Sequence, residues 1–196
     1  MTRRTARALA ALVAAGAVAA TSGCEWLASQ IPDVPSQSSA QPTAPASESA
    51  QQRTMRLDKE AAQNAYLNGS AEYDRIVMAG GAGKATRKLT DNLSGAYLKD
   101  AVETIQLFKE SGWHTDRSVS TRVTADQGWS ASKIELTACE DSTKVRTLDK
   151  SGQEVNKGGV RLIVQTLVAK KIDGRWKIDS QTSRPVKTFD NEAGCS

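Results

Sequence analysis

The sequence predicts an α+β domain over residues 54–196. Apolar residues recur at helical spacing in the first half of this region and alternate with polar residues in the second half. The dipeptide Asp173-Gly174 follows a long β-branched run and favours a two-residue hairpin turn. Helices followed by antiparallel strands are typical of the α+β class, and roughly 140 residues can enclose one core.

The first expected helix ends at the glycine pair 80–81, since glycine readily adopts the conformation that stops a helix. The spacing places Leu57, Ala61 and Ala65 on one face of this helix. The Asn-Gly-Ser stretch at 68–70 is a poor helix interior and predicts a kink or break there.

A second long helix is expected to end at Gly112. Its apolar residues Tyr97, Ala101, Ile105 and Phe108 recur at spacings of four, four and three. A shorter helical turn is expected before it, in the stretch ATRKLTDNL.

The second half of the domain has the two-residue period of strands. Ile134, Leu136 and Ala138 alternate with polar neighbours, which predicts a strand with one buried face. Trp176 and Ile178 share one face after the expected hairpin. The stretches SVSTRVTAD and TKVRTLDKSGQE supply two further short strands.

The start of the chain has the pattern of an export signal. The first seven residues, MTRRTAR, carry three arginines and no acid, and about thirteen uncharged residues follow, up to Ala20. A membrane-spanning helix needs roughly 18 apolar residues, so we expect a cleaved leader. The large apolar residues of a twin-arginine motif are missing, which favours a plain basic leader.

The leader ends in a sequence that resembles the lipobox of bacterial lipoproteins. Thr21, Ser22 and Gly23 precede Cys24, although leucine is commoner where Thr21 stands. The resemblance implies that a diacylglycerol is attached to the Cys24 thiol and that residues 1–23 are removed. Two acyl chains are enough for stable anchoring, here at the extracytoplasmic face of the cell membrane. The alternative is ordinary secretion with Cys24 free or paired.

Residues 24–53 have the composition of a disordered tether. They hold four of the chain's five prolines, with serine, alanine and glutamine between them. Such a segment cannot bury enough apolar surface to offset the entropy lost on ordering. A docking site for a groove in another protein is the alternative.

Charge and cysteine content restrict the partners. The chain carries +4, and removing the three leader arginines leaves about +1, so no nucleic-acid partner is expected. Apart from Cys24, the cysteines are Cys139 and Cys195, which we expect to pair in an oxidising compartment. Two separate buried thiols or a metal site are the alternatives. His114 is the single histidine, and no zinc spacing occurs, so neither a metal nor another cofactor is expected.

The predicted elements together resemble the NTF2-like (cystatin-like) superfamily and, among its members, the small secreted bacterial lipoproteins of that fold. The resemblance rests on the long first helix, the helix ending at Gly112, strands through ACEDSTKV and the hairpin KIDGRWKI. It implies a cone of curved antiparallel sheet wrapped by helices, over about residues 54–185. The superfamily includes isomerases, cyclases, dehydratases, carriers and non-catalytic adaptors, so its fold implies no single function.

An enzyme of this fold needs an acid or base inside the cone, typically in an Asp-His or Asp-Tyr combination. His114 follows the helix end, where capping or solvent exposure is the more common role. Alternation places Glu135 on the outward face, and Asp126 and Asp141 lie at expected turns, where carboxylates bind backbone amides. No GxSxG or HExxH motif occurs, so no catalytic residue is assigned.

The aromatic residues give the remaining candidates for a pocket or its rim. These candidates are Trp113, His114, Trp129 and Trp176, although packing in the core is the more common role for a tryptophan. Trp26 lies near the expected anchor, where an amphipathic ring suits the membrane interface.

The function expected from the sequence is a non-catalytic, lipid-tethered binding or adaptor module. Its partner would be an unidentified envelope protein or cell-wall component. The alternatives are a carrier of a small apolar ligand and an isomerase- or cyclase-like enzyme. A filled cone would favour the adaptor, an apolar pocket the carrier, and an apolar pocket with an inward carboxylate the enzyme.

Overall fold

The computed structural model describes residues 48–125, 128–155, 159, 161–190, 192 and 194–195. The expectations for the leader, for Cys24, for Trp26 and for most of the tether lie outside these described residues, as does Asp126. Within them, helices come first and antiparallel strands follow, so the predicted α+β class is confirmed.

Helix α1 spans Ala50–Met78 and begins four residues before the expected domain boundary. A reciprocal cap at its start explains this early beginning: Gln52 N donates to Ser49 Oγ at 3.2 Å, and Ser49 N donates to Gln52 Oε1 at 2.9 Å. The glycine pair after Met78 ends the helix as expected, with both glycines at positive φ.

One expectation for α1 was wrong and another was right only in part. The helix continues through 68–70 without a break, because Gly69 is buried against Leu93 and its missing side chain gives Leu93 room. The expected buried face is right for Ala65, which is 4% exposed, but not for Leu57, which is 48% exposed; Ala62 and Tyr66 are fully buried beside Ala65. Among the described residues, no helix combines the length and the apolar composition needed to cross a membrane.

Two further helices follow α1. Helix α2 spans Arg87–Asn92 within the expected turn. Helix α3 spans Gly95–Ser111, buries Ala101 and Ile105 as expected, and ends at Gly112, which is left-handed.

The strands form two antiparallel sheets among the described residues. The larger sheet has the order β2-β3-β5-β6, and its strands span Ser120–Thr124, Lys133–Asp141, Leu162–Ile172 and Arg175–Pro185. The smaller sheet pairs β1 (His114–Thr115) with β4 (Thr147–Leu148). The predicted hairpin joins β5 and β6, with Asp173 and Gly174 both at positive φ. A register shift between Val168 and Ala169 interrupts the pairing of these two strands, as β-bulges do in bent sheets.

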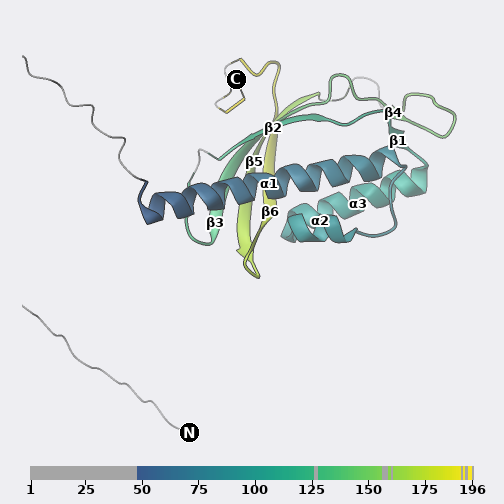
Figure 1. Cartoon of the computed structure of the whole chain (residues 1–196). Helices are drawn as coiled ribbons and strands as arrows, with labels where there is room; N and C mark the ends of the chain where they lie inside the picture. The colour runs from purple at the N-terminus through teal and green to yellow at the C-terminus, as the bar shows by residue number, and fades with distance from the viewer. Residues whose placement is uncertain are drawn as a thin grey trace, which may run out of the picture. The chain divides into compact units, whose positions relative to one another are not determined.

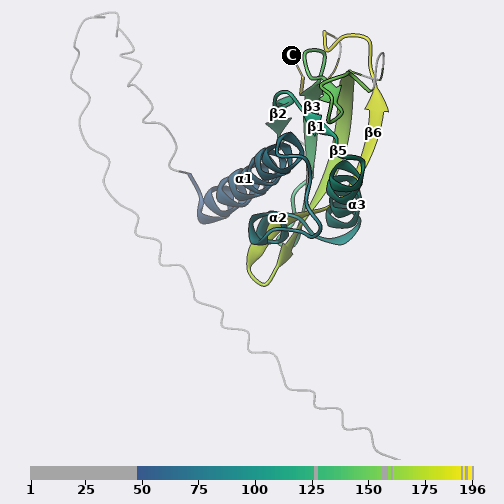
Figure 2. The same ribbon diagram turned by 90° about the vertical axis from the view of Figure 1, so that its right-hand side faces the viewer.

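The helices and the larger sheet enclose the main core. Helix α1 crosses the strands, and α2 and α3 lie on the same side of the sheet (Figures 1 and 2). The buried apolar side chains of this core include Tyr66, Ile105, Leu136, Leu167 and Ile178. The predicted burial of Ile134, Leu136 and Ala138 on one face of β3 is confirmed.

A second, smaller cluster covers part of the outer face of the sheet. Cys139 and Cys195 form the expected disulfide, with their Cα atoms 5.6 Å apart. Val164 is buried with them, and Val186 and Phe189 pack against this cluster. The C-terminal segment is therefore attached to β3 on the side opposite the helices.

Candidate ligand-binding pocket

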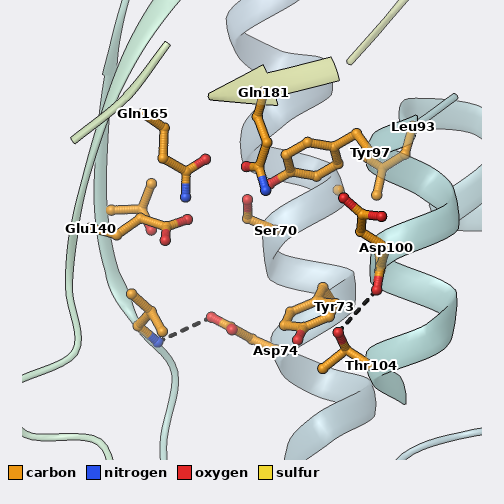
Figure 3. Close-up of a pocket in the computed structure, with 14 residues that line it drawn as sticks. Ser70, Tyr73, Asp74, Leu93, Tyr97, Asp100, Thr104, Glu140, Gln165 and Gln181 are labelled. Carbon is orange, nitrogen blue, oxygen red and sulfur yellow. Dashed lines mark hydrogen bonds between the residues drawn. The ribbon is translucent and has the colours of Figure 1, made fainter. Parts of the chain in front are cut away.

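A pocket of about 210 Å³ lies between the helices and the inner face of the larger sheet (Figure 3). Helices α1 and α3, strands β2, β3, β5 and β6, and single residues before α3 and β2 contribute to its wall. The lining residues are Gly69, Ser70, Tyr73, Asp74, Leu93, Tyr97, Asp100, Ala101, Thr104, Val119, Thr121, Glu140, Gln165 and Gln181.

Helical spacing explains which α3 side chains reach the pocket. Tyr97, Asp100, Ala101 and Thr104 stand three, four and seven residues apart, so they share one face of the helix. Across the pocket, α1 contributes four residues between Gly69 and Asp74.

The sheet contributes one polar side chain from each of its four strands. These are Thr121 on β2, Glu140 on β3, Gln165 on β5 and Gln181 on β6. Thr121 and Glu140 are direct partners in the strand register, so they point to the same face. The inner face of the sheet is thus apolar over the core and polar over the pocket.

Glu140 is held in place by a tyrosine from the core. The hydroxyl of Tyr66, which is fully buried on α1, donates to Glu140 Oε1 at 2.7 Å. Burial raises the pKa of the Glu140 carboxyl, and the hydrogen bonds from Tyr66 and Gln165 oppose that rise. Burial likewise raises the pKa of Tyr66 well above its ordinary value, so its hydroxyl stays a donor.

Asp74 is the second inward carboxyl group. Its Oδ2 accepts a hydrogen bond from the backbone N of Val119 at 3.1 Å. Burial raises the pKa of Asp74 to about 6, although the bond from Val119 lowers it, and the charge of Glu140 adds to the rise. Figure 3 shows both side chains at the same cavity, with Glu140 coming from the sheet and Asp74 from helix α1.

Two tyrosine side chains complete the helix side of the pocket. Burial raises the pKa of Tyr73 to about 12 and raises that of Tyr97 further. Both phenols therefore stay neutral at physiological pH and keep their hydroxyl protons. They give the pocket aromatic surface together with hydrogen-bonding groups.

Gln165 contributes a buried polar atom without a partner. Its side chain is directed into the pocket beside Glu140, and the residue is only 6% exposed (Figure 3). Its Oε1 makes no hydrogen bond within the described part of the chain. A buried acceptor without a donor costs free energy, so such atoms call for an explanation in each protein.

The residues predicted from the sequence lie elsewhere. Trp176 is in the core, where its Nε1 donates to Asp58 Oδ1 at 2.9 Å. Trp113 packs edge-on against Phe108, with 6.3 Å between ring centroids, and His114 pairs with β4. Trp129 is half-buried and packs against the main core. None of these four candidates lines the pocket.

The predicted carboxylates are also outside the pocket. Asp141 accepts hydrogen bonds from the backbone N and the hydroxyl of Thr143, which confirms its expected turn role. Glu135 lies on the outer face of β3 and pairs with Lys133 at 2.8 Å. The same alternation that places Glu135 on the outer face places Glu140 on the inner face, so the period of two in this strand also indicates an inward carboxyl at position 140.

A metal site is not formed by these groups: among the described residues, no cluster of three or more His, Cys, Asp or Glu side chains could hold a metal ion. The side chains that line the pocket offer hydrogen bonding, charge and proton exchange by carboxyl groups.

The chain is similar to known proteins only at the level of solved structures. No protein-family model and no curated protein matches the chain. Among solved structures, the intermembrane-space region of the chloroplast protein ARC6 is 18% identical, with a TM-score of 0.46, over 66% of this chain and 98% of that one.

Two bacterial structures show the expected fold. An NTF2-like protein with a cystatin-like fold from Novosphingobium aromaticivorans is 13% identical, with a TM-score of 0.39, over 75% of this chain and 95% of that one. A domain of unknown function with a cystatin-like fold from Nostoc punctiforme is 11% identical, with a TM-score of 0.39, over 70% and 82%. The fold named for these two structures is the one that the sequence resemblance implied, and the likeness of this chain to them concerns the fold alone.

Proposed function

We propose that this protein is a lipid-anchored extracytoplasmic bacterial lipoprotein whose domain binds a small molecule in the pocket without changing it chemically. The observation that carries the binding role is the pocket itself, into which each strand of the larger sheet directs a polar side chain. The lipobox-like sequence before Cys24 supports the anchor.

Several features of the pocket support binding. Its volume of about 210 Å³ is suited to a small molecule. The bond between Tyr66 and Glu140 fixes one polar group in advance, which lowers the entropy lost when a ligand is held. A filled cone would favour a pure adaptor, whereas the cone of this domain contains a pocket. A cell-wall component that carries a small polar group would fit such a pocket.

The lining argues against an apolar ligand. Glu140, Asp74 and Gln165 all face the cavity, and an apolar ligand would remove water from them without offering a hydrogen bond. A polar ligand replaces the lost water contacts, so we expect one here.

The pKa of Asp74 favours one other candidate, a proton-transferring enzyme. A carboxyl group with a pKa of about 6, close to Tyr73 in the pocket, suits general base catalysis near neutral pH. The two roles are separable by the fate of the ligand. If the ligand is recovered unchanged after prolonged incubation, binding is supported. If the wild type converts it to a product and the Asp74→Asn variant does not, the enzyme is supported.

The binding role is testable by filling the pocket mouth. Gln181 is exposed on the edge strand β6, so Gln181→Trp should occupy the mouth and leave the core intact. The side chain of Thr182, the next residue of β6, lies on the outer face of the sheet, so Thr182→Trp serves as the matched control. In a fragment screen of the full-length chain by ligand-observed NMR, we expect hits that Gln181→Trp abolishes and Thr182→Trp preserves. Hits that survive both changes would place binding outside the pocket.

The anchor has its own test. Replacing Cys24 by alanine removes the thiol to which lipid would be attached. We expect Cys24→Ala to block incorporation of a labelled fatty acid and to shift the protein from the membrane fraction to a soluble or unprocessed form. Unchanged labelling and membrane association would show that the lipoprotein proposal is wrong.

A further inference from the structure

The charged groups of the pocket are all acidic. Asp74, Asp100 and Glu140 line it, and no lysine, arginine or histidine is among the described residues of its wall. Two of these carboxyl groups are shielded from water, so charge inside the cavity is weakly screened. An anionic ligand would be repelled there, and a cationic ligand would be attracted.

The unpartnered atom of Gln165 indicates a hydrogen-bond donor. Gln165 is more than nine-tenths buried, and its side-chain amide already acts as a donor toward Glu140. Its Oε1 is left as an acceptor without a donor in the described structure. This observation is independent of charge, and a ligand with N–H groups would satisfy it.

The aromatic wall is compatible with the same ligand. Tyr73 and Tyr97 line the pocket opposite the sheet. Aromatic rings attract cations, and the effect grows when water is excluded. Carboxylates, a free carbonyl oxygen and tyrosine rings thus occur together around one cavity.

We infer that the ligand of this pocket is a primary amine, held through its ammonium group by Glu140, Asp74 and the Oε1 of Gln165. The inference rests on the proposed function, because it names the chemical class of the small molecule that the pocket binds. An ammonium group carries three N–H donors, and these three side chains supply acceptors on both the helix and the sheet side. Exchanging the ammonium for a hydroxyl removes the charge and two of the three donors.

The test uses three probes that share a phenylethyl group. These are phenethylamine, 2-phenylethanol and 3-phenylpropionate, which are cationic, neutral and anionic at pH 7.5. At that pH the Asp74 carboxyl is ionised, since its pKa is about 6. Titration calorimetry with the full-length chain should give a dissociation constant about tenfold or more lower for the amine than for the alcohol, because charge-assisted hydrogen bonds are roughly twice as strong as neutral ones.

A pair of variants on one strand separates charge from structure. Glu140→Gln keeps an acceptor for the Tyr66 hydroxyl and removes the charge, whereas Glu135→Gln makes the same change on the outer face of β3. We expect Glu140→Gln to weaken amine binding about tenfold and alcohol binding by less than about twofold. Glu135→Gln should alter neither. If Glu140→Gln fails to fold, Asp100→Asn at the exposed part of the pocket should weaken amine binding alone, by about threefold.

The outcomes distinguish the two proposals. Alcohol or carboxylate binding that equals or exceeds amine binding overturns the amine inference and leaves small-molecule binding standing. A Glu140→Gln variant that weakens all three probes equally also overturns it, because the effect would then be structural. If none of the three probes binds, the amine inference is wrong. The fragment screen with Gln181→Trp then decides the proposed function separately.

Discussion

Replacing Asp74 by asparagine should stabilise the domain at neutral pH. Asparagine keeps an oxygen for the bond from Val119 N and removes a charge that is half-buried beside Glu140. A pKa raised from 3.8 to about 6 means that the folded state disfavours the charged form. One pKa unit corresponds to about 1.4 kcal/mol, so ionising Asp74 in the folded state would cost about 3 kcal/mol if solvent did not screen the charge. Asp74 is only half-buried, so solvent reduces this cost, and we expect a gain of about 1–2 kcal/mol in the free energy of unfolding.

The sign of the pH dependence follows from the same pKa. Below pH 3.8 the carboxyl is protonated in both states and contributes nothing. Between pH 3.8 and 6 the unfolded chain loses the proton first, so the folded state binds more protons and stability falls as pH rises. The difference between the Asp74→Asn variant and the wild type should therefore be near zero at pH 3.5, grow through this window and stay constant above pH 7.

The assay is urea unfolding followed by circular dichroism at pH 3.5, 5 and 7. Asp100→Asn is the control, because Asp100 lies in the same pocket but is exposed, and its change should stay within about 0.5 kcal/mol. A destabilised Asp74→Asn at pH 7, or an equal gain at all three pH values, would refute the reasoning. A variant that gains stability while losing ligand affinity would show that Asp74 is retained for function.

Two further predictions concern stability. The Cys139–Cys195 disulfide joins residues that are 56 apart in the sequence, so its reduction should lower the free energy of unfolding by up to about 4 kcal/mol in the chain-entropy model. Thermal melts with and without reductant measure this loss. A melting temperature that reductant leaves unchanged would contradict the prediction. Gly69→Ala places a Cβ 2.7 Å from Leu93 Cδ2, and because Leu93 is fully buried we expect a net loss of about 1–2 kcal/mol despite the better helix propensity. Gly128→Ala, where a Cβ meets nothing within 4 Å, is the control, and equal effects of the two changes on urea unfolding would show that the contact with Leu93 is unimportant.

The pocket could have been predicted in part. The alternation of Ile134, Leu136 and Ala138 extends to residue 140, so an inward carboxyl at that end of the strand follows from the period of two. Asp74 and Tyr97 carried no comparable signal, because their spacing along the chain says nothing about their distance across the cavity. The tryptophans were the more conspicuous candidates, and tertiary packing placed them in the core or away from the pocket.

The sequence alone determined the helices, the strands and the turns that end or join them, because these features depend on residues close together in the chain. The two hydrophobic periods set the helices and strands, the glycine pair after Met78 and Gly112 ended two helices, and Asp173-Gly174 closed the hairpin. Each of these features depends on backbone conformation or on spacing within one element, so neighbours along the chain suffice to decide it.

The tertiary structure decided the features that need contacts between distant segments. Gly69 is a weak helix residue, yet α1 is continuous there because Leu93 packs where a side chain would stand. Glu140 is held by Tyr66 from 74 residues away, and its pKa rises because helices and sheet together exclude water. Burial and charge at the pocket are properties of the assembled layers, so the sequence alone determined the elements and the three-dimensional packing determined the site.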